Sequence, residues 1–347
     1  MNKNNVFVMS LLLGASLAVT SCNFLSPTVS NRKSSKKDSS EKQESSEVFE
    51  SSIAEESSSS GPFSFQYSEE NDRGDDPVID EENMTVEFGM YPQTRVRDDW
   101  LLERLNSLSE QEYPLGDWYG YQGHYYAKVI GKITDTKDSE GSYSKKFSNG
   151  DTIEVGATYW FNVEPILWDI IDIDGDFITM KSRYLLDTHW FDDDSNNYKE
   201  SDLRRWLNED FYDAAFVKSK KSKIVVSHVD NSPAQTDADS GYLCCEDTYD
   251  KIYVQSFVEM GGNVNNPISV SSDSRYFREL SDYCFATGAY KMNSQPYPGL
   301  YWLRSPSSLQ IDDSVDPDVW YMLGGRVWHW DVFALDIAVN PVLTIHR

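Results

Sequence analysis

The clearest periodic pattern along the chain predicts a long helix over residues 202–218. Apolar side chains recur there every three or four residues, a spacing that gathers them on one helical face. Ser201 can cap the first turn, and Asp202 suits the positive end of the helix dipole. We expect this face to pack against a sheet that includes Trp168. Its apolar members are Leu203, Trp206, Leu207, Phe211, Ala214 and Ala215.

A second main helix is expected over about 274–287, ending at Gly288, because glycine commonly follows the last turn of a helix. Its buried positions would be Phe277, Leu280 and Cys284. A shorter helical face comes earlier in the chain. It is formed by three leucines, Leu101, Leu105 and Leu108.

Strands are predicted where apolar residues alternate or cluster between turn residues. One such strand contains Val86 and Phe88, and another covers residues 125–130. Dipeptides that favour tight turns predict hairpins at Asn149-Gly150 and Asp174-Gly175. Towards the C-terminus, short apolar runs alternate with Gly and Pro, which is typical of short strands joined by long loops. Together with the helices, this mixture predicts an α+β fold and not alternating βαβ units.

The first residues of the chain have the pattern of a secretion signal. An uncharged, mostly apolar run covers residues 6–20 and is too short to span a bilayer. It ends at Val-Thr-Ser before Cys22, which resembles a bacterial lipobox. In that class, the signal peptide (here 1–21) is removed, the cysteine thiol is diacylglycerylated and the new amine is acylated, for example with palmitate. The alternative is an ordinary signal peptide followed by a chance cysteine.

Residues 22–83 are predicted to form a disordered tether that carries the lipidated Cys22. Residues 26–60 contain 14 serines, and residues 69–82 contain eight acidic residues against one arginine. Such segments bury too little apolar surface to fold. Residues 84–347 are then expected to form one domain.

Composition narrows the possible partners. The chain of 347 residues has a formal net charge of −26, so its surface repels phosphate backbones and we expect no nucleic-acid partner. Aromatic residues make up 14% of the chain, a density that requires burial or binding. Its 4 cysteines are too few for a disulfide scaffold.

Four short motifs, in this order, resemble those of one bacterial family of uncharacterised secreted and lipid-anchored proteins. They are Phe88–Thr94 (FGMYPQT), Val163–Trp168 (VEPILW), Asp202–Asn208 (DLRRWLN) and Tyr301–Pro306 (YWLRSP). The family usually closes with Gly-Val-Arg-Pro, whereas residues 338–341 here are Ala-Val-Asn-Pro, so no role for that arginine is carried over. The family is similar to the C-type-lectin-like superfold, which includes formylglycine-generating enzymes. That resemblance implies a single α+β domain with two main helices, small antiparallel sheets and long loops that carry the site. It implies no activity, because one superfold hosts many functions.

The candidate ligand-binding residues come from an aromatic group near the C-terminus. Aromatic rings stack on sugar faces, while Arg and His donate hydrogen bonds to hydroxyl groups. Strand alternation places Trp328 and Trp330 on one face of a strand and His329 on the opposite face. On another strand, it places Trp302 and Arg304 on the same face. The alternative for the tryptophans is core packing, and the alternative for the arginine is a structural ion pair. The candidate site residues are Trp302, Arg304, Trp328, His329 and Trp330.

The sequence patterns for a metal site, a disulfide or a catalytic site are weaker. Residues 192–197 (DDDSNN) carry oxygen ligands suited to calcium, but their spacing is not that of an EF-hand loop, so no metal site and no cofactor are predicted. A disulfide from Cys244 or Cys245 to Cys284 is possible, and no Cys-x-x-Cys pattern supports a reactive thiol. Motifs of the common hydrolases and nucleotide-binding enzymes are absent from the sequence. Carboxylates are abundant, so a glycosidase-like pair stays open.

These observations favour a lipid-anchored extracytoplasmic binding or adhesion module whose ligand is a glycan or an envelope protein. Its membrane partner would be reached through the lipid on Cys22, in the bacterial cell membrane or outer membrane. One alternative is an envelope enzyme that acts on glycans or protein side chains. Another is a structural envelope protein.

Overall fold

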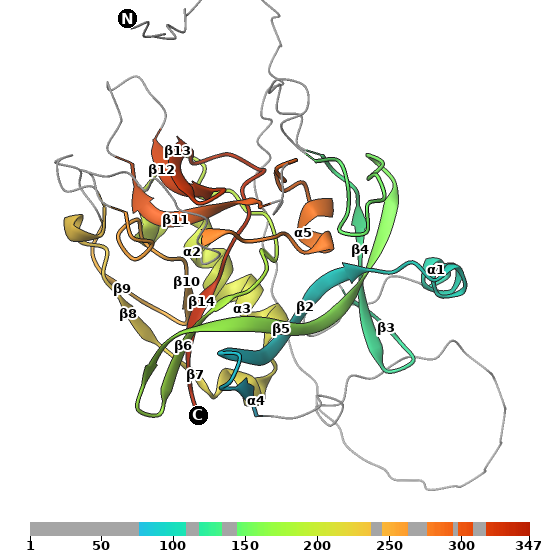
Figure 1. Cartoon of the computed structure of the whole chain (residues 1–347), viewed down its shortest axis with the longest axis horizontal. Helices are drawn as coiled ribbons and strands as arrows, with labels where there is room; N and C mark the ends of the chain where they lie inside the picture. The colour runs from blue at the N-terminus through green and yellow to red at the C-terminus, as the bar shows by residue number, and fades with distance from the viewer. Residues whose placement is uncertain are drawn as a thin grey trace, which may run out of the picture. The chain divides into compact units, whose positions relative to one another are not determined.

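A large antiparallel sheet runs through the centre of this computed structural model (Figure 1). Its strands are β1 (Val78–Asp80), β2 (Thr85–Arg95), β3 (Trp118–Tyr121), β4 (His124–Ile130), β5 (Thr158–Asp174), β6 (Phe177–Ser182), β7 (Ile224–Val225), β10 (Ile252–Tyr253) and β14 (Val342–His346). The main path through the sheet is β1-β2-β5-β6-β14-β10. The hairpin of β3 and β4 joins it along β5, and β7 joins it along β14. The structure describes residues 76–108, 118–133, 144–236, 245–262, 276–293, 298–307 and 317–347.

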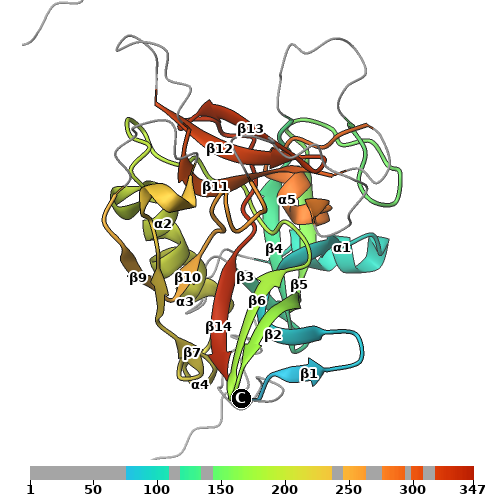
Figure 2. The same cartoon turned by 60° about the vertical axis from the view of Figure 1, so that its left-hand side comes forward.

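A smaller antiparallel sheet lies across one end of the large one (Figure 2). Its three strands, in spatial order, are β11 (Leu300–Pro306), β12 (Asp318–Leu323) and β13 (Arg326–Asp331). A separate two-stranded ribbon is formed by β8 (Ser227–Val229) and β9 (Thr248–Asp250).

Helices are short in the described part of the chain. They are α1 (Asp99–Asn106), α2 (Asp202–Trp206), α3 (Tyr212–Ala215), α4 (Lys218–Lys221) and α5 (Asp282–Ala286). A π-helical turn, η3 (Leu207–Phe211), joins α2 to α3, and two 3₁₀ turns are η2 (Tyr198–Glu200) and η4 (Pro233–Gln235). None of these helices is long and apolar enough to cross a membrane.

The predicted α+β fold with two main helices, of the C-type-lectin-like kind, is wrong, because the structure is rich in β-strands. The second predicted helix shows the reason. Ser281 accepts a hydrogen bond from the Cys284 amide and so caps a helix of only five residues. The residues just before it are extended, since Glu279 and Leu280 form β-bridges to distant segments. Tertiary pairing therefore outweighs the local helical pattern at this position.

The other predicted helix face is confirmed in its main features. Residues 202–215 are helical throughout, and Leu203, Leu207 and Phe211 are fully buried. They share one core cluster with Trp168, whose indole Nε1 donates to the Phe88 carbonyl at 2.7 Å. Trp206 is only partly buried.

The predicted hairpin at Asp174-Gly175 joins β5 to β6. Asp174 pairs with Phe177 across the turn, and Gly175 has a φ of +58°, a left-handed conformation that glycine adopts easily. The described residues lie in one unit, 62–347. Within the predicted tether, β1 pairs with β2, so ordered structure begins before residue 84. The predicted signal segment 1–21 and Cys22 lie outside the described residues.

Candidate functional site

Two tryptophan side chains stand exposed on one face of β13. Trp328 is 48% exposed and Trp330 is 54% exposed, while His329 between them faces the other way. In the described part of the chain, β13 pairs with β12 alone and forms the border of the small sheet. Strand geometry separates the two tryptophans by about 7 Å. We call Trp328 and Trp330 the tryptophan strip.

Polar groups accompany the tryptophan strip. A hollow of about 420 Å³ is lined by Asp318, Tyr321, Trp328, His329, Trp330 and Asp331. Asp318 lies directly opposite Asp331 across β12 and β13, and its Oδ2 is 2.5 Å from His329 Nδ1. Register and alternation place Tyr321 on the face of the indoles, whereas Asp318, His329 and Asp331 belong to the opposite face of the strands and border the hollow from there. Sequence reasoning missed Asp318, Tyr321 and Asp331 as lining residues, because the lining depends on the pairing of β12 with β13.

Trp302 lies in the interior and is therefore not part of the exposed tryptophan strip. It is fully buried on β11, and its indole Nε1 donates to the carbonyl of His189 at 2.7 Å. Its ring also packs edge-on against Phe191. A side chain enclosed in this way supports the core and offers no surface to a ligand.

Arg304 also lies in the interior, with 2% of its surface exposed. Its guanidinium donates to both carboxylate oxygens of Glu259 and to the backbone carbonyls of Val254 and Asp230. This is the structural ion pair that was the alternative for this residue.

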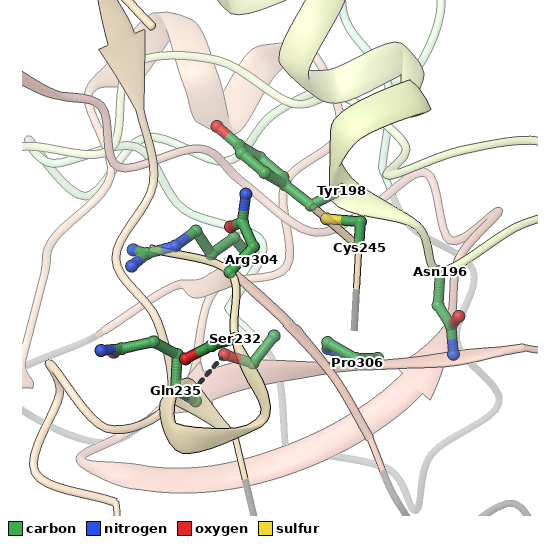
Figure 3. A pocket seen from close by; sticks show the side chains of 9 residues that line it. Asn196, Tyr198, Ser232, Gln235, Cys245, Arg304 and Pro306 are labelled. Atoms are coloured by element: carbon green, nitrogen blue, oxygen red, sulfur yellow. Dashed lines mark hydrogen bonds between the residues drawn. The ribbon is translucent and has the colours of Figure 1, made fainter. Parts of the chain in front are cut away.

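A small cavity adjoins Arg304 (Figure 3). Tyr198 and Cys245 lie on one side of it, and Ser232 and Gln235 lie on the other. Its volume of about 10 Å³ matches about one water molecule and is far too small for a sugar. Among the described residues, this cavity therefore leaves Arg304 no room for a sugar.

The acidic loop at residues 192–197 lies close to a further acidic residue, Asp202, which the spacing within the loop did not predict as a neighbour. Carboxylate oxygens of Asp192, Asp193 and Asp202 lie within 4.8 Å of one another. Asp192 is engaged in the loop, since it accepts hydrogen bonds from the backbone amides of Ser195 and Asp202. The negative charge of Asp193 raises the pKa of neighbouring Asp194. Three such carboxylates could hold a hard cation, although the loop also explains their positions without one.

Cys245 and Cys284 are both free thiols, so the disulfide considered for Cys284 is not formed. Burial raises the pKa of both thiols, which keeps them protonated and unreactive near neutral pH. Cys244 lies outside the described residues.

Comparison with protein families gives one match. A domain described as "Domain of unknown function (DUF6273)" spans residues 175–346, which include β6, β14 and the whole small sheet. Two of the four sequence motifs, Asp202–Asn208 and Tyr301–Pro306, lie inside it. The match is consistent with an uncharacterised domain family, and it supports neither a lipoprotein nor a C-type-lectin-like relationship. Searches of curated proteins and of solved structures give no match.

Proposed function

We propose that this chain is a lipid-anchored, extracytoplasmic glycan-binding module that binds sugar through the tryptophan strip of β13. The observation that carries the proposal is the pair of exposed indoles, Trp328 and Trp330, on one face of a border strand. Sugar rings present apolar C–H faces, which stack on aromatic side chains. Contiguous exposed apolar surface commonly marks an interaction site.

The surroundings of the strip supply the polar half of such a site. Hydroxyl groups of a sugar need donors and acceptors, and Asp318, His329 and Asp331 border the same hollow from the opposite face of the strands. Its volume of about 420 Å³ lies within the range of small-ligand sites. One or two sugar units could therefore rest on the indoles, and Tyr321, which lies opposite Trp328, is on the same face of the sheet.

The anchoring part of the proposal is supported by the sequence of residues 1–22. A lipid on Cys22 and the serine-rich segment after it would hold the domain near the membrane at a distance set by the tether. Two or more acyl chains give stable attachment, at about 0.8 kcal/mol per buried CH₂ group. Mass spectrometry of the membrane fraction would show the lipid on Cys22, and a Cys22→Ala chain should leave that fraction.

The binding test uses the full chain and compares three variants. Trp328→Ala and Trp330→Ala should each weaken binding to glycans and peptidoglycan fragments by about fivefold, because each stacked ring contributes on the order of 1 kcal/mol. Trp100→Ala is the matched control, since Trp100 is 52% exposed on α1, away from the strip. Calorimetry on a panel of fragments would measure the affinities. The proposal fails if no glycan binds or if all three variants behave alike.

A second candidate is a glycan hydrolase, favoured by the carboxylate pair in the same hollow. Residues directly opposite on antiparallel strands have Cβ atoms about 5 Å apart, so Asp318 and Asp331 can approach the 5–10 Å separation that glycosidases use. In that case Asp331→Asn should abolish release of reducing ends from a bound glycan while leaving affinity nearly unchanged. A binding module releases none in either form.

A further inference from the structure

The large sheet carries a row of four neighbouring side chains, three of them polar, on the face opposite to that of the adjacent core row. Asp169 on β5 lies opposite Lys181 on β6, Lys181 lies opposite Val342 on β14, and Val342 lies opposite Tyr253 on β10. Directly opposite residues of antiparallel strands point to the same face. The adjacent row belongs to the main core and comprises Ile170, Met180, Leu343 and Ile252.

The polar side chains of this row, Asp169, Lys181 and Tyr253, line a groove of about 750 Å³. One wall comes from the segment after β10, with Gln255 and Glu259, and another comes from Tyr276 and Arg278. The volume is that of a site for a small organic ligand, not for a single ion. A β-bulge at Ile171 on β5 directs Asp172 to the rim of the groove.

Two arginines share a single carboxylate in this groove. Arg183 donates to Asp169 Oδ1 at 2.8 Å through Nε, and Arg278 donates to Asp169 Oδ2 at 2.6 Å through Nη1. One negative charge facing two guanidinium groups leaves one positive charge in excess. Arg278 is 6% exposed, and its Nε has no hydrogen-bond partner in the structure.

The neighbouring charges balance one another, because Lys181 and Arg304 are positive while Asp172 and Glu259 are negative. Lys181 is also 6% exposed, and its ammonium donates to Gln255 Oε1 at 3.2 Å. The carboxylate of Glu259 is already held by the guanidinium fork of Arg304, which lies behind the wall. Buried cations in a low-dielectric setting are stabilised strongly by an added anion. With all of these groups counted, the groove keeps one positive charge in excess in a chain whose net charge is −26, which favours a negative ligand there.

The remaining lining suits a hydroxylated ring. Burial raises the pKa of Tyr253 to about 12, with a further contribution from Glu259, so its hydroxyl stays a neutral hydrogen-bond donor. The phenol rings of Tyr253 and Tyr276 provide faces for stacking, and Gln255 and Asp172 offer polar atoms for hydroxyl groups.

We propose that this groove binds a small carboxylate-bearing sugar, with its carboxylate against Arg183 and Arg278 and its ring beside Tyr253. A planar carboxylate matches the fork of a guanidinium, which makes this anion a better fit than a point-like one. The groove is a second site, built from residues other than those of the tryptophan strip, and it does not depend on the function proposed for that strip.

Calorimetry on the full chain would test the proposal with three acidic sugars: glucuronate, galacturonate and N-acetylneuraminate. Glucose and galactose are the neutral counterparts of glucuronate and galacturonate, and inorganic phosphate is the control for simple anion binding. At least one acidic sugar should bind saturably, and its affinity should fall as salt is raised because the contact is electrostatic. The proposal is overturned if none of the three binds, if glucose or galactose binds as well, or if phosphate competes with equal strength.

Variants locate the binding within the groove. Arg183→Gln should weaken acidic-sugar binding by about tenfold or more, and Arg183→Lys should weaken it less, since it keeps the charge and loses the fork. Arg183→Lys also retains a second cation beside Asp169, which protects the fold if the glutamine variant is unstable. Arg97→Gln is the control, because it removes an exposed arginine that does not line the groove. Undiminished binding by both Arg183 variants overturns the proposal, as does equal loss in Trp328→Ala, which would place the ligand on the strip.

Discussion

Arg304 holds Glu259 through both carboxylate oxygens, with Nη1 2.6 Å from Oε2 and Nη2 2.6 Å from Oε1. The same oxygen, Oε2, accepts a hydrogen bond from the backbone amide of Ser256. One arginine on β11 therefore fixes the segment that forms a wall of the sheet groove. Its contribution to any ligand site is indirect, through the position of Glu259.

Replacing Arg304 with methionine should lower the free energy of unfolding by about 3 kcal/mol. The change leaves the carbonyls of Val254 and Asp230 without their donor and removes the cation beside Glu259. Urea denaturation would measure the loss. Arg326→Met provides the control, because Arg326 is exposed on β13. A loss no larger than that of the control would show that the ion pair contributes little.

Gly89 should tolerate no side chain. Its φ is +75°, and an added Cβ would lie 2.5 Å from Phe216 Cε1 and 2.9 Å from the Ala215 carbonyl oxygen. Gly89→Ala should therefore cost the left-handed penalty of about 1–2 kcal/mol together with overpacking of about 1–3 kcal/mol. Gly175→Ala isolates the first cost, since Gly175 has a φ of +58° with open space around it. Thermal denaturation of the pair should separate the two costs, and equal melting temperatures would contradict the steric argument.

The helical face of residues 202–215 should be a main source of stability. Leu207 is fully buried in the core cluster with Trp168, so Leu207→Ala should cost about 2–5 kcal/mol. Leu335→Ala should change stability by less than about 0.5 kcal/mol, because Leu335 is largely exposed. Chemical denaturation of both variants provides the comparison. Similar costs at the two positions would mean that this face is not a packed core.

Asp187 should make stability depend on pH. Burial raises its pKa to about 6, although the hydrogen bond from the Tyr91 hydroxyl at 2.6 Å opposes that rise. An unfolded aspartate has a pKa of about 3.9, so between these values the folded state binds more protons than the unfolded state. The contribution of Asp187 is therefore most favourable below about pH 4 and declines as pH rises to about 6.

Substituting asparagine at position 187 tests this prediction. Melting temperatures measured from pH 4 to pH 7 should fall less steeply in Asp187→Asn than in the unmodified chain. Asp193→Asn is a suitable comparison, since Asp193 is an exposed acid in the 192–197 loop. Parallel curves for the unmodified chain and Asp187→Asn would contradict the assigned pKa.

The local pattern of the sequence was enough to predict several features without knowledge of the tertiary structure. The three- and four-residue spacing of Leu203, Leu207 and Phe211 predicted a buried helical face, because helix geometry depends on nearby residues alone. Asp174-Gly175 predicted a hairpin for the same reason. Alternation likewise predicted that Trp328 and Trp330 share one face.

The tertiary structure decided which of these residues meet solvent and which distant residues meet each other. Trp302 and Trp328 have the same chemistry, yet the first lies inside the core and the second on a border strand. The pairing of Asp169 with Lys181 follows from a short hairpin, but its alignment with Tyr253 requires β14 to lie between β6 and β10. Such register is set by packing over the whole sheet, because contacts between distant segments leave no periodic signal in the sequence.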